Sequence, residues 1–430
     1  MTSFALINGR LIDGTGQEPK DGWGIVVKDT DILSVDHTRS LAIPSDATVI
    51  DVEGRTLMPG LIDPHTHLCY HVSEMALLLQ QMTESVEMNT IKAAESARVI
   101  LATGCTAIGD GGTRGNIAVA IRDAVKKRLI PGPKVVAAGQ MLSGSSGLQD
   151  HTMAWGYYDD VAYLGTVVNG PLEVRTAVRK QVRLGVDWVK VTASGVPGGF
   201  HISGHTQDLE FDELSAAVKE AAKFGKTVHA HAHDPDGLKD ATRAGVLSLH
   251  SGEFADEEGL TLMKEYGCVF VPTIAWLHYR VKDEYAREYT RYYKMTDKDI
   301  EWFKDECREA YEACREAIVL AHKIGTPTAV GSDAAHVFPP YDIAYEMEYF
   351  QDLGIAPLQI ITDATKVAAQ AIGRADVWGT LEPGKAADIL VVNGDPSKDV
   401  RILQDKSRIV MMVQDGYVVK DILAKEPVTV

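Results

Sequence analysis

The stretch that decides the fold is Gly60-Leu61-Ile62-Asp63-Pro64-His65-Thr66-His67, an apolar run that ends in two histidines. Because residues i and i+2 of a strand face the same side, both imidazoles would project from one strand end as a chelating pair. The alternative is a surface strand with two solvated histidines, which this stretch alone does not exclude. The rest of the sequence favours the metal-binding pair over two solvated histidines.

Length, charge and cysteine content indicate which classes of protein this chain can belong to. The chain has 430 residues, 45% of them hydrophobic, enough for one large domain and a smaller one. A formal net charge of -17 without a long basic run argues against nucleic acid or membrane as the partner and favours a small molecule. The N-terminus shows no secretory signal, and no transmembrane segment is expected. Five scattered cysteines without a CxxC pair indicate a reducing, cytoplasmic setting.

Strands alternate with helical patterns between residues 59 and 377, as is typical of parallel βα units. Eight candidate strands predict a closed barrel. They are Gly60–His67, Thr106–Asp110, Lys134–Gly139, Trp188–Ser194, Thr227–Ala232, Leu247–Gly252, Cys268–Thr273 and Thr328–Asp333. In such a barrel the functional groups lie at the carboxyl ends of the strands.

Both ends of the chain have a different sequence pattern, in which short predicted strands are separated by Gly, Asp and Pro. Strands are expected near residues 5–14, 24–27 and 47–52, and again near 387–392, 408–413 and 417–419. Strands at both termini around a long middle predict that the two ends pair in a small sandwich or barrel.

Polar residues that a packed core would not choose occur at the barrel strand ends. Lys190 lies inside an apolar strand, where a buried ammonium must be neutralised, paired or chemically altered unless it snorkels to the rim. Other strand ends carry histidines and a carboxylate: His229, His231 and His233 in the fifth, His250 in the sixth and Asp333 in the eighth. At most one or two of the three histidines in the fifth strand can reach a site. Packing does not readily explain this set.

Together these motifs resemble the amidohydrolase superfamily, metal-dependent hydrolases with a distorted (β/α)8 TIM barrel and a small β-sandwich built from both chain ends. The resemblance covers essentially the whole chain. It rests on Leu57–His67, Val189-Lys190, Val228–Ala232, Gly331–Asp333 and the tail motif Gly379–Val392. It implies an α/β fold with residues 1–58 and 378–430 in the sandwich and 59–377 in the barrel. Within the superfamily the chain resembles imidazolonepropionase-like and Xaa-Pro or Xaa-Arg dipeptidase-like enzymes.

The resemblance also implies a binuclear centre of two divalent ions, with zinc favoured. By matching position, the ligands are His65 and His67 for one ion, His231 and His250 for the other, a carboxylated Lys190 as the bridge, and Asp333 as ligand and base. His233 falls where several relatives have a tyrosine near the substrate, so it is a candidate substrate contact.

Two departures from the family pattern stand out. Many relatives read Glu-His-Gly where this chain has His250-Ser251-Gly252, so His250 comes one position early. Because adjacent strand residues face opposite sides, either the strand end is rearranged to let His250 bind, or the second metal site is incomplete. Leu148 stands where peptidase-like relatives carry a histidine, which puts dipeptide specificity in doubt and leaves the metal chemistry untouched.

The implied activity is hydrolysis of an amide or peptide-like C–N bond in a small molecule, such as an N-acyl amino acid or dipeptide, by metal-bound hydroxide. Asp333 would take the hydroxide proton and pass it to the departing amine. The alternatives are a hydrolase of aromatic ureas, carbamates or cyclic amides, a mononuclear deaminase-like enzyme, and a metal-binding barrel without activity. Lys190 favours hydrolysis, since deaminase relatives typically lack the bridging lysine. A homo-oligomer is expected, as is common in this family.

Residues 273–310 form a long aromatic segment after the seventh strand. Such an insertion at the catalytic end of a barrel is often a lid, and the alternative is an amphipathic helix packed on the barrel wall or on another subunit. As a lid it would make Tyr279 a substrate contact. His151, His201 and His205, in loops after the third and fourth strands, are further candidates, with a surface position as the alternative.

Overall fold

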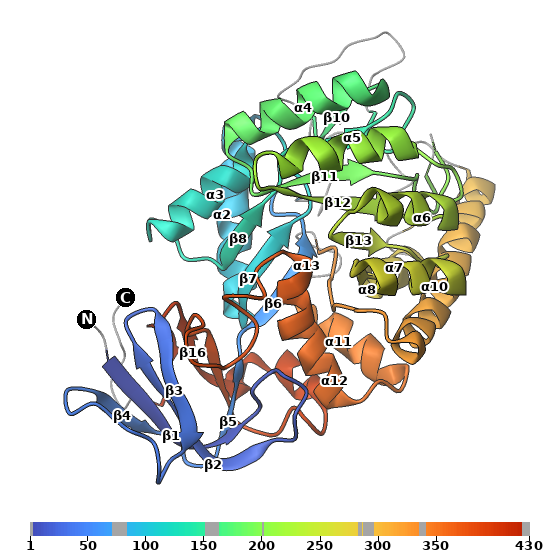
Figure 1. Cartoon of the computed structure of the whole chain (residues 1–430). Helices are drawn as coiled ribbons and strands as arrows, with labels where there is room; N and C mark the ends of the chain where they lie inside the picture. Colours follow the sequence, from blue (N-terminus) through green and yellow to red (C-terminus); the bar gives the residue numbers. More distant parts are fainter. Residues whose placement is uncertain are drawn as a thin grey trace. The chain divides into compact units, whose positions relative to one another are not determined.

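The computed structural model describes residues 3–70, 84–150, 163–199, 202–282, 286, 296–334 and 341–423 (Figure 1). The chain divides into two compact units. The first comprises Met1–Ile62, Leu101–Ala107 and Ile343–Val430, and the second Asp63–Ile100 and Ile108–Asp342. This division groups residues 343–377 with the terminal segments, and the domain boundaries expected from the family resemblance stay a prediction.

One sheet with strands from both chain ends forms the framework of the first unit. Its order is β17-β16-β15-β5-β1-β2-β3, with β4 paired to β1. The strands are β1 (Ser3–Leu11), β2 (Lys20–Lys28), β3 (Asp31–His37), β4 (Thr48–Asp51), β5 (Thr56–Pro59), β15 (Ile389–Val392), β16 (Ile409–Gln414) and β17 (Tyr417–Asp421). The two ends meet where β5 runs antiparallel to β15. The expected pairing of the termini is therefore seen, within one sheet, while the sandwich stays a prediction.

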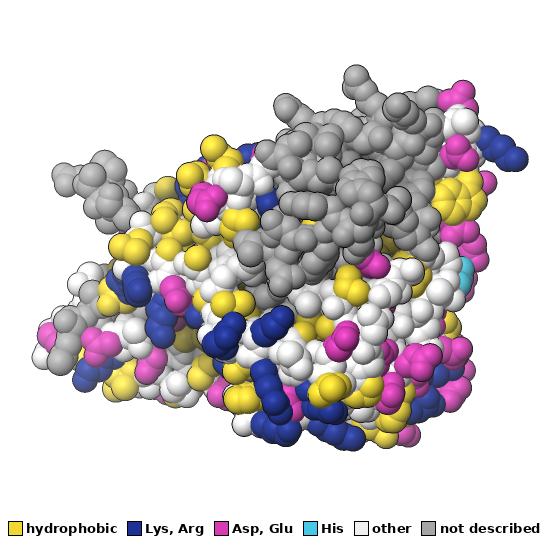
Figure 2. All heavy atoms as spheres, turned by 90° about the horizontal axis from the view of Figure 1, so that it is seen from above, with side chains coloured by type: hydrophobic (Ala, Val, Ile, Leu, Met, Phe, Trp, Pro, Cys, Tyr) yellow, Lys and Arg dark blue, Asp and Glu magenta, His cyan; other side chains and the backbone are white. Residues whose placement is uncertain are grey.

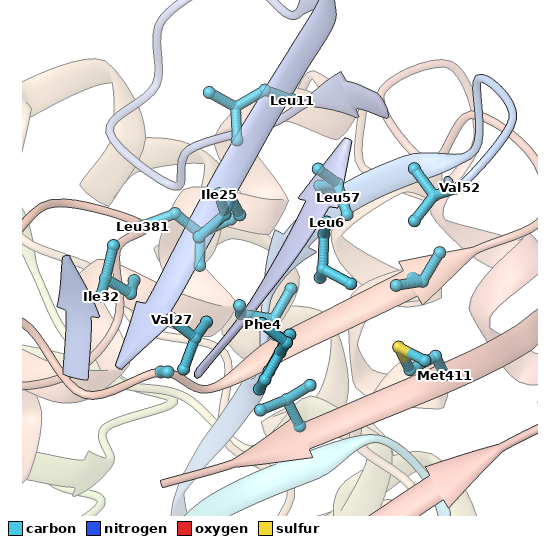
Figure 3. Packing of buried hydrophobic residues seen from close by; sticks show 14 of the residues in the cluster. Phe4, Leu6, Leu11, Ile25, Val27, Ile32, Val52, Leu57, Leu381 and Met411 are labelled. Carbon is cyan, nitrogen blue, oxygen red and sulfur yellow. The ribbon is translucent and has the colours of Figure 1, made fainter. Parts of the chain in front are cut away.

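Buried apolar side chains from both ends fill the core of this unit (Figure 3). Leu6, Ile25 and Leu57 from the N-terminal strands pack with Val391 and Met411 from the C-terminal strands. Strands with one buried face gain stability from such contacts between neighbouring side chains. The unit also holds α11 (Ile343–Asp352), α12 (Pro357–Thr362), a π-helical turn (Asp363–Val367), α13 (Ala368–Ala371) and two 3-10 turns (Val400–Gln404 and Lys406–Arg408).

The second unit consists of parallel strands that alternate with helices. Two of these strands, β6 and β7, begin in the first unit. The strands form two ladders, β6-β7-β8 and β10-β9-β11-β12-β13-β14. Their bounds are β6 (Leu61–Thr66), β7 (Cys105–Asp110), β8 (Lys134–Ala137), β9 (Met141–Ser143), β10 (Gly165–Val167), β11 (Trp188–Thr192), β12 (Thr227–Ala232), β13 (Ser248–Ser251) and β14 (Val269–Val271). The helices are α2 (Val86–Ala102), α3 (Ile117–Lys126), α4 (Gly170–Leu184), α5 (Phe211–Ala222), α6 (Pro235–Ala244), α7 (Glu257–Tyr266), α8 (Ile274–Arg280) and α10 (Asp297–Ile324). The predicted βα alternation is confirmed.

The eighth predicted strand, Thr328–Asp333, is not a regular strand. A single bridge connects Thr328 to Phe270, and another connects Ala334, directly after the segment, to Thr66. Between them, the side chain of Asp63 accepts hydrogen bonds from the backbone N and Oγ of Ser332, so a side chain takes a donor that a strand ladder would use. Within the described residues the regular strands of the second unit therefore form two ladders, and closure of the barrel stays a prediction.

Helix ends follow the local sequence. Glu210 and Glu213 form a capping box at the start of α5, and Thr296 and Asp299 form one at the start of α10. The long α10 ends at Gly325, whose φ of 81° is a left-handed conformation that glycine adopts without a steric penalty. These signals explain why α10 runs unbroken between two defined caps.

No helix in the described ranges is both long and apolar enough to cross a membrane. On the face shown in Figure 2, acidic and basic side chains are interspersed among the described residues.

Candidate metal centre

His65 and His67, at the end of β6, both approach Asp333. Their Nε2 atoms lie 3.4 and 3.2 Å from Asp333 Oδ1, and one ligand atom from each of the three residues lies within 4.8 Å of the others. Two donors about 2.1 Å from one ion at a tetrahedral angle are about 3.4 Å apart, so the spacing fits a divalent cation. Burial lowers the pKa of His65 well below its usual value, which keeps this ring neutral, as ligation requires.

Backbone groups set the direction of the His67 ring. Its Nδ1 lies 3.0 Å from the carbonyl oxygen of Gly112, so Nδ1–H donates there and Nε2 is left for the side of Asp333. Tyr341 donates its hydroxyl to the carbonyl of His67 at 2.8 Å, which holds the strand end itself. By contrast, Nδ1 of His65 is buried and has no hydrogen-bond partner among the residues that the structure describes.

Asp63 joins the first strand to the eighth strand segment. Its Oδ1 accepts from the backbone N of His65 at 3.2 Å and of Ser332 at 3.1 Å, and its Oδ2 accepts from Ser332 Oγ at 2.5 Å. Burial raises the pKa of Asp63 to about 7, although the bonds from Ser332 oppose this shift. Asp333 follows directly with a φ of 49°, in the left-handed region. Asp63 thus helps to place His65 and Asp333 together.

Lys190 lies in the middle of β11 and is only 1% exposed, so it does not reach the rim. Burial lowers the pKa of its amine to about 7, while the charge of Asp333 acts in the opposite direction. Its Nζ is 2.6 Å from Nδ1 of His250. The lysine is therefore enclosed beside two of the predicted ligand residues.

His231 and His250 are register partners across β12 and β13. Nε2 of His231 is 3.3 Å from the carbonyl oxygen of Gly195 and donates to it, which leaves Nδ1 for a ligand. The ring of His250 lies 4.2 Å from that of His65, measured between centroids. Ser251 has a φ of 75°, so the chain turns away directly after His250. This geometry matches the rearranged strand end, and the ligand role of His250 stays a prediction.

His233 forms a buried pair with Glu253 beyond the ligand residues. Its Nδ1 bonds to Glu253 Oε2, and both side chains are fully buried. Burial lowers the pKa of His233 to about 3 and raises that of Glu253 well above its usual value. Within the described part of the chain, His233 Nε2 has no hydrogen-bond partner, and the centroid of the Trp276 ring lies 6.3 Å from that of His233. The substrate role of His233 stays a prediction, supported by this unpartnered nitrogen.

The other candidate substrate contacts that the structure describes lie beside residues that are not predicted metal ligands. Tyr279 is half-buried on α8, with Lys282 Nζ 4.1 Å from its ring centroid. The ring of the exposed His205 lies 4.3 Å from that of Phe254. His151 and His201 lie outside the described residues. The substrate roles of these residues stay predictions.

The described part of the aromatic segment belongs to α8 and α10. Phe303 and Cys307 of α10 are fully buried and pack with Ala286. This packing favours the amphipathic-helix alternative over the lid for that part of the segment.

Sequence reasoning missed two residues that support the histidine pair. Asp63 lies inside the Gly60–His67 motif, and its neighbours in sequence do not reveal its contact with Ser332. A Cβ on Gly111 would stand 2.6 Å from Cδ2 of His65 and 3.1 Å from Cε1 of His67, so glycine at this position leaves room for both rings. The available signal was the Gly111-Gly112 pair directly after the second predicted strand, where a backbone approaches another group closely.

Comparison with known proteins adds to this geometry. The chain is 28% identical to an ochratoxinase of Aspergillus niger, over 96% of this chain and 85% of that protein. It is 25% identical to an imidazolonepropionase of Symbiobacterium thermophilum, over 88% of this chain and 86% of that one. The crystal structure of a Xaa-Pro dipeptidase with methionine bound in its active site superposes with a TM-score of 0.84 at 27% identity, covering 97% of this chain and 100% of that one.

The fold is thus α/β and TIM-barrel-like, as in these structural neighbours. The model of the amidohydrolase family matches residues 56–419, which include every predicted ligand. By this match, this chain belongs to the amidohydrolase family, and it is an enzyme that hydrolyses carbon–nitrogen bonds.

Proposed function

We propose that this chain is a binuclear-metal amidohydrolase that cleaves the amide or peptide-like bond of a small molecule, such as an N-acyl amino acid or a dipeptide. The observation that carries the proposal is the convergence of His65, His67 and Asp333 at metal-ligand spacing. The buried Lys190, within hydrogen-bond distance of His250, extends the same cluster.

The donor set fits divalent metal ions, and zinc suits it best. Imidazole nitrogens and carboxylate oxygens are ordinary zinc ligands. His65, His67 and Asp333 would hold one ion, and His231 and His250 the other, with a carboxylated Lys190 between them. When bound, the ions supply Lewis acidity and lower the pKa of a bound water.

The protein's own groups handle the protons. Because burial lowers its pKa to about 7, the Lys190 amine is partly neutral near neutral pH, and a neutral amine adds carbon dioxide to form a carbamate with release of one proton. The Asp333 carboxylate, fixed at the strand end, accepts a proton from the attacking water and returns it to the leaving amine nitrogen. Nε2 of His233 offers the substrate one hydrogen-bonding nitrogen.

The first experiment is metal content per chain, combined with intact mass under gentle conditions. About two ions and the added mass of carbon dioxide on Lys190 are expected. Activity is then measured on N-acyl amino acids, dipeptides and arylureas. One ion with an unmodified lysine would contradict the binuclear proposal and favour the mononuclear, deaminase-like alternative.

A second candidate is hydrolysis of aromatic amides, ureas, carbamates or cyclic amides. Trp276 lies near His233, and the Arg280 guanidinium is 4.3 Å from the centroid of the Trp276 ring. The surroundings of His233 therefore include an aromatic side chain. The similarity to an ochratoxinase supports including ochratoxin among the substrates tested. Preference for aromatic acyl groups over aliphatic ones in that panel would favour this candidate.

The remaining expectations are proposals of the same kind. We expect a small-molecule substrate, no nucleic-acid or membrane partner, a cytoplasmic location and a homo-oligomer.

A further inference from the structure

Four hydrogen bonds between side chains connect Lys190 to the start of β12. Nζ of Lys190 lies 2.6 Å from His250 Nδ1, and His250 Nε2 lies 2.9 Å from Ser248 Oγ. Ser248 Oγ is also 2.7 Å from Nδ1 of His229, whose Nε2 is 2.9 Å from Thr227 Oγ1. These five side chains form the polar row. The proposed function uses Lys190 and His250 and leaves Ser248 and His229 without a role.

The polar row is enclosed by three neighbouring strands. Lys190, His229 and Ser248 are register partners across β11, β12 and β13, so their side chains share one face. His229, Ser248 and His250 are 0% exposed. The ring of Trp188 packs on His229 with 3.7 Å between centroids. Water therefore does not compete for the hydrogen bonds among Lys190, His250, Ser248 and His229, whereas Thr227 is only partly buried, and packing limits the rotation of the rings.

The number of donors on each side chain fixes the donor-to-acceptor direction of every hydrogen bond in the polar row. A neutral imidazole carries one N–H and a hydroxyl one O–H, so each member donates once. In the metal-free protein, a Lys190 ammonium has hydrogen but no lone pair to offer, so it donates to His250 Nδ1. His250 then carries its proton on Nε2 and donates to Ser248. Ser248 in turn donates to His229, and His229 donates to Thr227.

We propose that Ser248 and His229 are positioning residues that hold His250 in its Nε2–H tautomer and direct its Nδ1 lone pair toward the metal centre. Without metal, this lone pair accepts from Lys190, and it is the lone pair that His250 can offer to an ion. The inference rests on the proposed binuclear centre. It explains how a histidine followed directly by the left-handed Ser251 can serve as a ligand, because side-chain hydrogen bonds and not the strand end orient the ring.

The tautomer can be measured without metal or substrate. Nitrogen-15 NMR of histidine-labelled, metal-free protein at pH 6, where Lys190 is mostly an ammonium, reports which nitrogen carries the proton, and His250→Gln identifies the signals of His250. We expect the proton on Nε2 in the wild type and a mixture of tautomers in Ser248→Ala. A His250 proton on Nδ1 in the wild type, or an unchanged spectrum in Ser248→Ala, would overturn the inference.

Metal affinity gives the second measurement, by zinc titration against a chromophoric chelator. Removing the hydrogen-bond partner of a ligand histidine typically costs about 10- to 100-fold in metal affinity. Ser248→Ala should lose this much at one of the two sites and nothing at the other. Ser248→Thr keeps the hydroxyl and should restore the affinity. Thr242→Val, which removes a buried hydroxyl on α6 that bonds to the Leu238 carbonyl, should change neither site.

The outcomes separate the inference from the proposed function. Wild-type affinity at both sites in Ser248→Ala overturns the positioning role. A wild type that binds a single ion overturns the binuclear proposal and the ligand role of His250, and the tautomer measurement then decides the positioning role. If Ser248→Ala does not fold, Ser248→Cys keeps the volume with a weaker hydrogen-bonding group and takes its place.

Discussion

Asp333 combines a strained backbone with a central chemical position. Its φ of 49° lies in the left-handed region, and its Oδ1 is within 3.4 Å of both histidines at the end of β6. Asp63 and Ser332 hold the neighbouring backbone in place. Non-glycine residues in this conformation are often found at functional sites, where the surrounding structure compensates the strain.

Asp333→Asn should abolish most turnover and leave metal binding largely intact. The amide keeps the shape and one oxygen ligand but cannot accept a proton, and loss of a general base typically costs about 10²- to 10⁴-fold in kcat. Steady-state kinetics and metal content on the same sample measure both effects. Asp240→Asn, which alters a partly buried carboxylate bonded to Gln207, is the control and should keep its activity. Full activity in Asp333→Asn would remove this residue from the mechanism.

Burial of Lys190 should make the stability of the metal-free protein depend on pH. Its pKa falls from 10.5 to about 7 in the folded chain, so the unfolded chain binds more protons between these values. Stability therefore rises with pH across this window, and below about pH 7 burial of the ammonium costs on the order of 5 kcal/mol. Lys190→Met should raise the melting temperature at pH 6, with the gain shrinking toward pH 10.

Differential scanning fluorimetry at both pH values tests this expectation. Lys180→Met, at an exposed position on α4, serves as the control and should show no such trend. A gain in Lys190→Met that is the same at pH 6 and pH 10 would contradict the expected titration of Lys190.

Local sequence predicted the proximity of His65, His67 and Asp333, because each follows an apolar strand pattern. It did not indicate the contacts that orient them. The hydrogen bond from Ser332 to Asp63 joins residues 269 positions apart, and no window of sequence shows such a pairing. For His250, sequence left two alternatives open, and the left-handed Ser251 and the bond to Lys190 match the rearranged strand end.

Among the elements, those with strong periodic patterns were predicted best. β12 has the predicted bounds, Thr227–Ala232, because its sequence alternates small or branched residues with histidine. β9 and β10 were missed, since each has only three residues and no period can be read from so few. The segment Thr328–Asp333 was apolar enough to predict a strand, but the tertiary contact of Asp63 replaced part of its ladder.

Asp208 ties the loop after β9 to β11. Its carboxylate accepts from the backbone N atoms of Gly144 and Leu148 and from the hydroxyls of Ser143 and Thr192. Asp208→Ala leaves these donors without their acceptor, and unsatisfied groups of this kind cost about 1 to 3 kcal/mol each when buried. We expect a melting temperature lower by several degrees and faster proteolytic cleavage within residues 143–150.

Thermal melting with limited proteolysis and mass spectrometry measures both effects. Gln207→Ala, at the adjacent position, removes only one bond to Asp240 and is the matched control. Equal protection of the loop in Asp208→Ala and in the wild type would show that other contacts hold it.

At the scale of the whole molecule, composition predicted the class of protein, whereas the sequence could not reveal how the strands close. An acidic chain with a large apolar fraction fits a globular enzyme, and the family match over residues 56–419 agrees with that expectation. The pairing of the chain ends was predictable because both ends share the same β-rich texture. The continuity of the ladders depends on many weak contacts and was not predictable.

The five cysteines should be unreactive in the native protein. All five are free thiols and buried, and burial raises the pKa of Cys69 and of Cys268 to about 12. Since the thiolate is the reactive form, a thiol reagent should label fewer than about one group per native chain and all five after denaturation. Dithiothreitol should leave the melting temperature unchanged. Rapid labelling of several thiols in the native state would contradict the burial of the thiols.

The contact between Asp63 and Ser332 also determines when the site can form during synthesis. Its partners are 269 residues apart. At about 5 to 20 residues per second, a ribosome needs roughly 13 to 54 s to add that many residues. A nascent chain that has already exposed both histidines of the β6 pair therefore spends this interval without the carboxylate that completes their donor set. A metal ion held by all three of these donors could therefore bind only after residue 333 has been added, when 97 residues of the chain are still to follow.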